Sequence, residues 1–386
     1  MAAVLSGVLD AIDPKEGDVL THGFHSYPAR MHYAVARGLL EALAGTNTRV
    51  LDPFCGSGTV LIEATSRGLP ATGLDLSPLA LRIAEIKSAR RSDDDIERFG
   101  TKALAVVEAS QERVTGKVYI RGPLSADERT WYDPHVLLEL SGLHAEIQQL
   151  PDDFERRALQ VVLSSIVVKF SRQRADTTDE VVQRRIAPGV PTDFFGRKCN
   201  ELARRWKSLA ALMTVDAPRV QLRAGDARRI AAVVGPKRRY DLVISSPPYG
   251  GTYDYVEHHR RRRAWLGLTA RELEKGEIGA RRRLSADTQM PRDKALAQWD
   301  SEVSDTLTSV AAVLSGPTAP VIFFVGDGEV AGKRVDAAAQ LRRLAPAAGM
   351  RVVASAGVSR IDWQGGKPRA EHLVQLQLAE PEPEKP

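Results

Sequence analysis

The chain has 386 residues, of which 43% are hydrophobic and 27% are charged, a composition ordinary for a globular protein. It contains no apolar run of the roughly 18 residues that span a bilayer, and no basic cluster precedes an apolar core at its start. We therefore expect a cytoplasmic protein without a membrane partner. The only cysteines, Cys55 and Cys199, exclude a disulfide framework and a multi-cysteine metal site, and we expect no metal.

The first part of the chain alternates between strand and helix patterns. Val50 and Leu51 lead from a strand into a glycine-bearing turn, and residues 60–67 follow as a helix. Residues 71–74 form the next short strand, which ends at Asp75, and residues 78–90 form another helix. This β-α-β-α order predicts a parallel sheet covered by helices.

The pattern changes to helices between residues 92 and 216. Helical spacing of apolar residues covers 136–150, 154–170 and 194–213, with polar or proline-bearing loops between them. We interpret this stretch as a mostly helical insertion.

Strand patterns return after the insertion, at 220–223, 241–245, 321–325, 351–358 and 372–378. The third of these is almost wholly apolar, as expected for a central parallel strand, and the last two look like a closing pair. The sequence thus predicts an α/β fold in which residues 1–91 and 217–378 build one sheet around the insertion 92–216. The polar tail, residues 379–386, is expected to be disordered.

A glycine turn joins the first strand to its helix in the sequence Val50-Leu-Asp-Pro-Phe-Cys-Gly-Ser-Gly-Thr59. Gly56 and Gly58 allow a ligand to approach the backbone, and the helix start offers free amide groups to an anion. Asp75, at the end of the next strand, can accept hydrogen bonds from two ribose hydroxyls. A phosphate loop is disfavoured because its lysine is absent, and a dinucleotide loop because Leu61 stands where a third glycine is needed.

A second motif lies in the sequence Asp241-Leu-Val-Ile-Ser-Ser-Pro-Pro-Tyr-Gly250, where an apolar strand runs into two prolines. The prolines fix the backbone, so that nearby carbonyl groups are held rigidly and can grip an amino group that donates two hydrogen bonds. The Ser246 hydroxyl can act as a further acceptor, and the Tyr249 ring offers a face on which a base can stack.

These two motifs resemble those of the S-adenosylmethionine-dependent methyltransferases that act on exocyclic amino groups in DNA, of the adenine-N6 and cytosine-N4 type. The resemblance extends to Gly23-Phe-His-Ser-Tyr-Pro-Ala-Arg30, to Ala224-Gly-Asp-Ala-Arg228 and to the helix within Tyr253–Gly267. It implies a Rossmann-like class I methyltransferase sheet and S-adenosyl-L-methionine as the cofactor. It also implies DNA as the partner, with cytosine favoured over adenine because the motif begins with serine.

The resemblance assigns roles to individual residues. Cofactor binding is expected for Tyr27, Asp52, Phe54, Gly56, Ser57, Gly58, Thr59, Asp75 and Asp226, and catalysis for Ser246, Pro247, Pro248 and Tyr249. The four consecutive arginines Arg260, Arg261, Arg262 and Arg263 follow the catalytic motif, and we expect about two of them to contact phosphates.

Three alternatives to this interpretation differ in their support, and the sequence excludes the first of them. Methylation at ring carbon 5 of cytosine needs a cysteine nucleophile after a proline, and neither cysteine has that neighbour. An enzyme that methylates guanine amino groups in RNA is the second possibility, although such enzymes often carry an N-terminal RNA-binding module and only a short segment precedes Gly23. The third is a non-catalytic nucleic-acid-binding protein on a methyltransferase scaffold.

Overall fold

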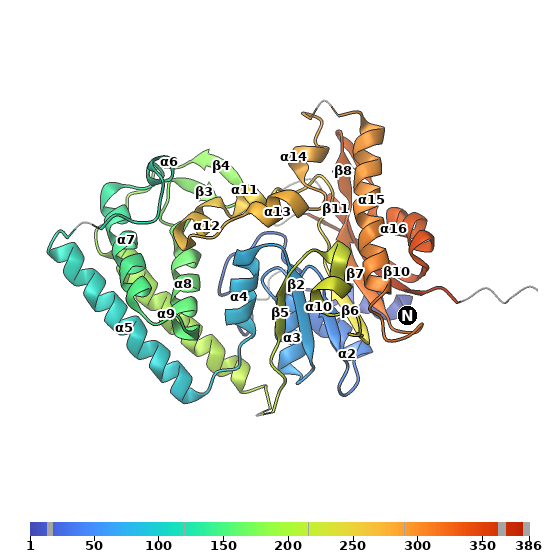
Figure 1. Cartoon of the computed structure of the whole chain (residues 1–386), viewed down its shortest axis with the longest axis horizontal. Coiled ribbons are helices and arrows are strands. Elements are labelled where there is room, and N and C mark those ends of the chain that lie inside the picture. Colours follow the sequence, from blue (N-terminus) through green and yellow to red (C-terminus); the bar gives the residue numbers. More distant parts are fainter. Residues whose placement is uncertain (14–17, 119, 215, 289, 362–367, 381–386) are drawn as a thin grey trace, which may run out of the picture.

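A seven-stranded mixed sheet lies at the centre of the computed structural model, which describes residues 1–13, 18–118, 120–214, 216–288, 290–361 and 368–380 (Figure 1). The strands follow the order β10-β11-β7-β6-β1-β2-β5. They are β1 (Val50–Asp52), β2 (Ala71–Asp75), β5 (Gln221–Ala224), β6 (Leu242–Ser245), β7 (Val321–Gly326), β10 (Met350–Ile361) and β11 (Pro368–Leu378). Most of the tail for which disorder is expected, residues 381–386, lies outside the described part of the chain.

The five strands from β5 to β7 run parallel, whereas β11 runs antiparallel to β7 and to β10. This arrangement confirms the predicted α/β fold, in which segments before and after the helical stretch build one largely parallel sheet. The closing pair is antiparallel, and its second strand, β11, takes the place beside β7. The chain therefore forms the outer strand β10 first and returns as β11 between β10 and β7. The spacing of apolar residues does not predict this strand order.

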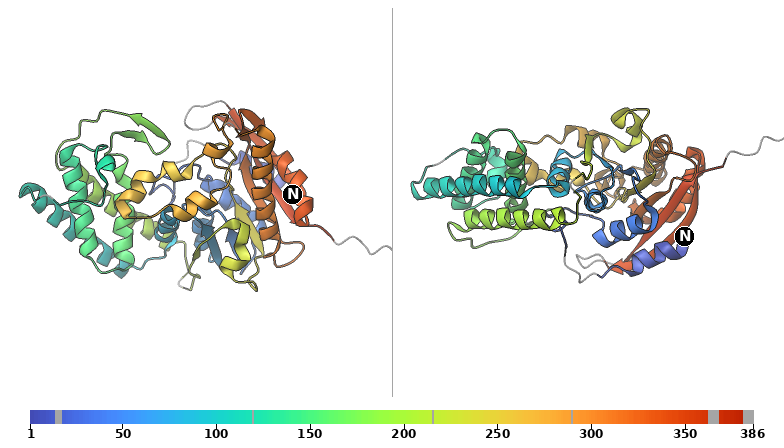
Figure 2. Two further views of the ribbon diagram at one scale, coloured as in Figure 1. Left: turned by 45° about the horizontal axis from the view of Figure 1, so that its top comes forward. Right: turned by 90° about the horizontal axis from the view of Figure 1, so that it is seen from below.

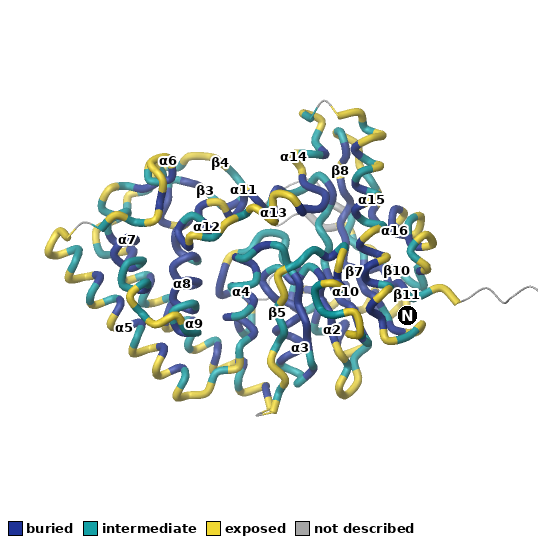
Figure 3. Tube along the Cα trace, viewed as in Figure 1, coloured by how far each residue is buried: buried dark blue, intermediate teal, exposed yellow. Residues whose placement is uncertain are grey.

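Helices cover both faces of the sheet. The central strand β7 therefore carries apolar side chains on both of its faces. Ile322 and Phe324 pack on one face with α1 (Ala2–Asp10), α2 (Tyr33–Leu43) and α3 (Thr59–Ser66). Val321, Phe323 and Val325 pack on the other face with α10 (Ile230–Val234), α15 (Arg292–Ala311) and α16 (Ala337–Leu344). Successive side chains of a strand point to opposite faces, so a continuous apolar run marks a strand that is buried on both sides (Figure 3).

The stretch between β2 and β5 forms a helical bundle beside the sheet (Figures 1 and 2). Its core includes Phe99, Leu140, Leu163 and Trp206, and it continues into α4 (Pro78–Ser88) through Ile83. The bundle contains α5 (Asp93–Thr115), α6 (Ala126–Arg129), α7 (Pro134–Gln149), α8 (Phe154–Val167) and α9 (Val190–Ala210), with a small hairpin of β3 (Gln173–Ala175) and β4 (Thr178–Val181). The three predicted helices correspond to α7, α8 and α9, whereas the sequence pattern does not predict α5 or the hairpin.

Four short helices link the end of β6 to α15, and Figure 1 shows the first three of them lying between the sheet and the bundle. They are α11 (Tyr255–His258), α12 (Arg260–Leu266), α13 (Arg271–Gly276) and α14 (Arg281–Leu284). Beyond β7 lies a second small hairpin, β8 (Gly328–Val330) with β9 (Lys333–Val335), and short 3-10 turns occupy Ala227–Arg229 and Ala345–Ala348. Within the described residues, no helix combines the length and the apolarity needed to cross a membrane.

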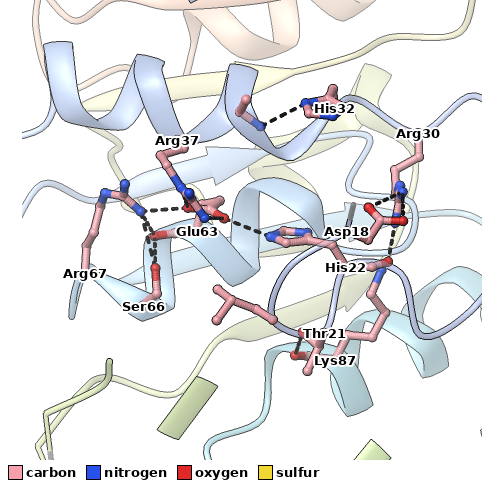
Figure 4. A network of polar contacts seen from close by, with 12 residues as sticks. Asp18, Thr21, His22, Arg30, His32, Arg37, Glu63, Ser66, Arg67 and Lys87 are labelled. Carbon is pink, nitrogen blue, oxygen red and sulfur yellow. Dashed lines mark hydrogen bonds and ion pairs between the residues drawn. The ribbon is translucent and has the colours of Figure 1, made fainter. Parts of the chain in front are cut away.

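A buried polar network ties the N-terminal segment to α3 (Figure 4). His22 Nε2 lies 2.8 Å from Glu63 Oε1, and both side chains are almost fully buried. Arg37 and Arg67 contact the other oxygen of Glu63 at 3.2 and 2.8 Å. Burial alone would raise the pKa of Glu63, but hydrogen bonds from His22 and Arg37 lower it to about 2. Burial lowers the pKa of His22 to about 4.

The fold should therefore lose stability as the pH falls from about 6.5 towards 4, because the unfolded chain protonates His22 there and the folded chain does not. Each pH unit in this range costs up to about 1.4 kcal/mol through this one group. Urea unfolding at pH 7 and pH 5 measures the effect. In His22→Gln, which cannot titrate, the difference in unfolding free energy between the two pH values should be smaller. An equal difference in the wild type and the variant would contradict this account.

Candidate active site

The parallel strands bring the two sequence motifs together at their carboxyl ends, around one cavity of about 860 Å³ including its open mouth. Strand ends at a common edge are where open α/β sheets bind ligands. Of the residues assigned to a site, the cavity is lined by Tyr27, Asp52, Phe54, Gly56, Ser57, Thr59, Asp75, Asp226, Ser246 and Pro248. The sequence motifs thus converge on one place, although they are far apart along the chain.

Asp75 fixes the glycine turn to the end of β2. One oxygen of its carboxylate accepts a hydrogen bond from the Gly56 amide at 2.9 Å, and the other accepts from the Ser77 amide at 2.7 Å. Burial raises the pKa of Asp75 to about 6, against the opposing effect of these amide groups. The carboxylate still lines the cavity, so it can hold both the turn and a hydroxyl-bearing ligand.

Asp52 connects the first motif to the second. Its Oδ1 atom accepts hydrogen bonds from Ser245 Oγ at 2.6 Å and from the Phe54 amide at 3.2 Å. Asp52 and Ser245 are both buried, and burial raises the pKa of Asp52 to about 7. The bond fixes the start of the Ser-Pro-Pro-Tyr motif relative to the glycine turn, because Ser245 directly precedes Ser246.

The two glycines of the turn have different functions. At Gly56, φ is +47°, and an added Cβ would lie 3.3 Å from the ring of Tyr27, which covers the turn. At Gly58, φ is +87°, and a Cβ would lie 3.1 Å from the Ala84 Cβ on α4. Gly58 therefore packs the start of α3 against α4 and does not line the cavity, although the sequence motif predicts that it binds the cofactor.

Asp226 lies at the edge of the cavity, but its carboxylate is already paired. Arg228 contacts both of its oxygens, at 3.0 and 2.6 Å, and also donates to the Gly276 carbonyl at 3.2 Å. Burial would raise the pKa of Asp226, but Arg228 lowers it below the usual value. At the position expected near an adenine ring, the carboxylate is thus held in an ion pair that competes with a ligand for its oxygens.

The Ser-Pro-Pro-Tyr motif lies between the first cavity and a second one of about 480 Å³ including its open mouth. Pro248 and Phe54 line both, whereas Pro247 and Tyr249 line only the second. The Tyr249 ring packs so closely over Gly326, at the end of β7, that a Cβ there would lie 2.5 Å from it. The structure therefore separates Ser246, which faces the first cavity, from Tyr249, which faces the second.

The far wall of the first cavity comes from a segment to which the sequence motifs assign no role. Tyr255 of α11 and residues 276–278, at and after the end of α13, line it. The buried Glu277 accepts a hydrogen bond from the Tyr255 amide at 2.6 Å, and it also pairs with Arg282. The resemblance covers Tyr255 within Tyr253–Gly267 but assigns it no role, and no sequence motif marks residues 276–278, whose position depends on the path of the chain from β6 to α15.

Three of the four arginines of α12 are buried, so fewer are free than the two or so that we expect to contact phosphates. Arg260 has a half-exposed side chain that pairs with Glu128 at 2.7 Å. Arg261 is buried with its guanidinium 3.6 Å from the centre of the Trp131 ring, and Arg263 is buried against the Val256 carbonyl. Arg262 is buried and contacts both carboxylate oxygens of Asp176, at 2.8 and 2.7 Å. Of these four arginines, only Arg260 remains accessible to a phosphate in this conformation.

The clustered acids and histidines elsewhere do not lie at this cavity. Asp327, Asp336 and His372 have potential metal-binding atoms within 4.8 Å of one another, but Arg334 pairs with Asp327 there. The adjacent His258 and His259 are both buried, and the ring of His259 packs on Tyr27 at 4.6 Å between centres. His259 thus supports the residue that covers the glycine turn.

Comparison with known proteins supports a methyltransferase relationship for part of the chain. Residues 24–98 match the family model described as UPF0020, RMKL-like methyltransferase domain. The type II methyltransferase M.MvaI of Kocuria varians is 25% identical over 272 residues, which make up 64% of this chain and 58% of that protein. The type II methyltransferase M.MjaII of Methanocaldococcus jannaschii is 32% identical over 78 residues, 20% of this chain and 15% of that protein. The chain thus spans less than two thirds of the length of these relatives.

Among solved structures, the rRNA methyltransferase aviRa from Streptomyces viridochromogenes is similar over 95% of this chain and 94% of its own, with 14% sequence identity and a TM-score of 0.37. The TehB-like S-adenosylmethionine-dependent methyltransferase from Corynebacterium glutamicum has a TM-score of 0.32 at 12% identity, over 89% of this chain and 87% of its own. Likeness at this level carries no argument about substrate.

The buried Arg262–Asp176 pair should hold the β3–β4 hairpin against α12. Replacing Arg262 by Met leaves an unpaired buried carboxylate, which should cost about 3–5 kcal/mol and increase amide hydrogen exchange in residues 171–182. Arg174→Met is the control, because the Arg174–Glu180 pair of the same hairpin is exposed and should contribute about 0–1 kcal/mol. Equal exchange in the two variants would show that the buried pair does not order the hairpin.

Proposed function

We propose that the protein is an S-adenosylmethionine-dependent methyltransferase that transfers a methyl group to an exocyclic amino group of a base in DNA. The observation that carries this proposal is the convergence of the glycine turn, Asp75 and Ser246 on one cavity. The family match over residues 24–98 and the two type II methyltransferase relatives support methyl transfer as the reaction. DNA is favoured because the motifs resemble those of DNA amino-methyltransferases.

The residues around the cavity suit S-adenosylmethionine. Asp75 offers a carboxylate to ribose hydroxyls, the turn at Gly56 lets a ligand approach the backbone, and the start of α3 offers amide groups to a carboxylate. Tyr27 covers the turn from the other side. When it is bound, the cofactor supplies an electrophilic methyl group on a sulfonium centre.

The chain's own task is to present an amine to that methyl group. The lone pair of an exocyclic amine is delocalised into the base ring, so the amine is a poor nucleophile. Acceptors at Ser246 and at the backbone near Pro247 can hold the two amine hydrogens, which favours a more tetrahedral nitrogen and frees its lone pair. The Asp52–Ser245 bond keeps these acceptors in place, so that positioning and electrostatics supply most of the rate. The proton that the amine loses can pass to solvent.

Tyr249 is assigned to the base itself. Its ring lies beside an apolar cavity with Trp299 and Phe54, where a base rotated out of its duplex would find a stacking surface. In this proposal the two cavities serve two ligands, the cofactor in the first and the target base near the second, with Phe54 and Pro248 between them.

Methylation at ring carbon 5 is not supported, because it needs a thiolate. Cys55 belongs to the glycine turn and lines the first cavity, but its side chain is buried, and burial raises its thiol pKa well above the usual value. Cys199 lies buried in the helical bundle, where burial also raises its thiol pKa. Neither thiol is available to attack a base.

The helical bundle between β2 and β5 is assigned to choosing the target sequence. The Arg262–Asp176 pair connects it to the segment that follows the catalytic motif, and the β3–β4 hairpin carries the exposed side chains of Arg174 and Glu180. A surface of this kind next to the site can contact bases or phosphates on either side of the target.

The cofactor assignment predicts a difference between two acidic residues of the cavity. Asp75→Ala should weaken S-adenosylmethionine binding by about 1–3 kcal/mol, because the ligand loses charged hydrogen bonds. Asp226→Asn should have a smaller effect, since Arg228 already occupies that carboxylate. The affinity of the wild type should also decrease as the pH drops below about 6, where Asp75 becomes protonated. Calorimetry on folded variants measures these affinities. Equal losses of S-adenosylmethionine affinity in the two variants would contradict the proposed role of Asp75.

The chemical assignment predicts a separate pattern in single-turnover methylation of duplex DNA. Ser246→Ala should slow the chemical step more than it weakens DNA binding, because it removes an acceptor at the reacting nitrogen. Tyr249→Phe keeps the stacking ring and should retain most of the activity, whereas Tyr249→Ala should lose it. Cys55→Ser should still transfer the methyl group.

Three outcomes, measured with duplex DNA and with structured RNA as substrates, would contradict the proposal. A Cys55→Ser enzyme that binds DNA and cofactor normally but is inactive, while Ser246→Ala is fully active, would indicate a covalent mechanism. Transfer to structured RNA with none to DNA would favour the RNA alternative, and cofactor binding without transfer to either would favour the scaffold alternative.

A further inference from the structure

A fully buried lysine lies directly behind the glycine turn. Lys87, near the end of α4, has no exposed surface, and its Nζ atom lies 3.3 Å from Ser57 Oγ, while Ser57 itself lines the first cavity. Two hydrogen bonds fix this end of α4, from Thr21 Oγ1 to the Lys87 carbonyl at 2.6 Å and from Trp206 Nε1 to the Ile86 carbonyl at 2.8 Å. The lysine therefore has little freedom to point elsewhere.

Lys87 has no carboxylate partner within 4.0 Å among the residues that the structure describes. Asp18 faces it, but both Asp18 oxygens are bound by Arg30, at 2.7 and 2.9 Å (Figure 4). The other charged or titratable groups around Lys87 are Arg30, Arg205, His22 and His25, none of which is an acid. Burial, and then the charge of Arg30, lower the pKa of Lys87 well below its usual range.

A buried amine that is not paired with a carboxylate is costly, and such a group is usually matched by an anion. Other groups near Lys87 also attract negative charge. The first turn of α3, which begins at Thr59 directly after the turn, has unpaired amide groups and no side-chain cap at Gly58. Arg30 lines the same cavity as Ser57 and Thr59. The cavity thus has one region suited to a carboxylate and another, around Asp75, suited to hydroxyl groups.

We propose that Lys87, through Ser57, is a positioning residue for the carboxylate at the amino-acid end of the bound cofactor. This inference rests on the proposed function, because it assigns one end of the same ligand. The carboxylate would compensate the buried amine, and Ser57 would pass the hydrogen bond from Lys87 to the ligand. Fixing that end limits where the sulfur and its methyl group can lie relative to Ser246.

The test compares two ligands that differ only in the carboxylate, S-adenosylmethionine and its decarboxylated form, by calorimetry. Lys87→Met should weaken binding of S-adenosylmethionine about 10-fold or more and binding of the decarboxylated ligand by less than about 2-fold. Lys198→Met is the matched control. Lys198 is also partly buried and contacts the N-terminal segment at the Phe24 carbonyl, but it has its own acid, Glu201, at 2.7 Å. Lys198→Met should therefore leave the affinities for both ligands unchanged.

Equal losses for the two ligands in Lys87→Met would overturn the proposal and leave Lys87 with a role in packing alone. Wild-type protein that binds neither ligand would instead overturn the proposed function, and this inference with it. Ser57→Ala provides the same comparison if Lys87→Met does not fold. It removes the hydrogen bond to the lysine and should weaken binding of the carboxylated ligand selectively, whereas an unselective effect would contradict the proposal.

Discussion

The hydrogen bond between Ser245 and Asp52 is the interaction on which the geometry of the site depends. It joins the ends of two neighbouring parallel strands, β6 and β1, through side chains 193 residues apart in the sequence. Both groups are buried, so the bond has no competition from water, and the raised pKa of Asp52 reflects the same burial. Because Ser246 follows Ser245 directly and Phe54 follows Asp52 by two positions, one bond sets the spacing between the two motifs.

The remaining contacts extend this fixed centre in two directions. Towards the sheet, Asp75 holds the Gly56 amide, and Tyr27 closes over the same glycine. Towards the helical bundle, His259 packs on Tyr27, and Arg262 of the same short segment binds Asp176 of the β3–β4 hairpin. A continuous set of contacts therefore runs from the cavity to the hairpin, so a change in the hairpin can reach the turn without a large movement of the sheet.

The fold and the centre of the site follow from local sequence features. Apolar runs bounded by turn residues indicate the strands, and the β-α-β order places Asp75 at the end of the strand that follows the glycine turn. The nearness of Ser246 to Asp52 depends on the strand order, in which β6 is the neighbour of β1. Contacts between distant segments cannot be predicted in this way. Four consecutive arginines look like a solvated surface, and only Trp131 and Asp176, from a separate part of the chain, explain why Arg261 and Arg262 are buried. No sequence motif marks Lys87, because the role proposed for it depends on its contact with Ser57 and on the pairing of the nearby Asp18 with Arg30.

The methyl group is transferred to an exocyclic amino nitrogen in the proposed reaction, and nucleoside mass spectrometry tests this most directly. Duplex DNA is incubated with the purified protein and S-adenosylmethionine that carries an isotopically labelled methyl group, and is then digested to nucleosides. The account predicts label in N4-methyldeoxycytidine, or in N6-methyldeoxyadenosine if the pocket accepts adenine. Label confined to 5-methyldeoxycytidine would contradict it, because that product needs a nucleophilic thiol that the buried Cys55 and Cys199 cannot supply.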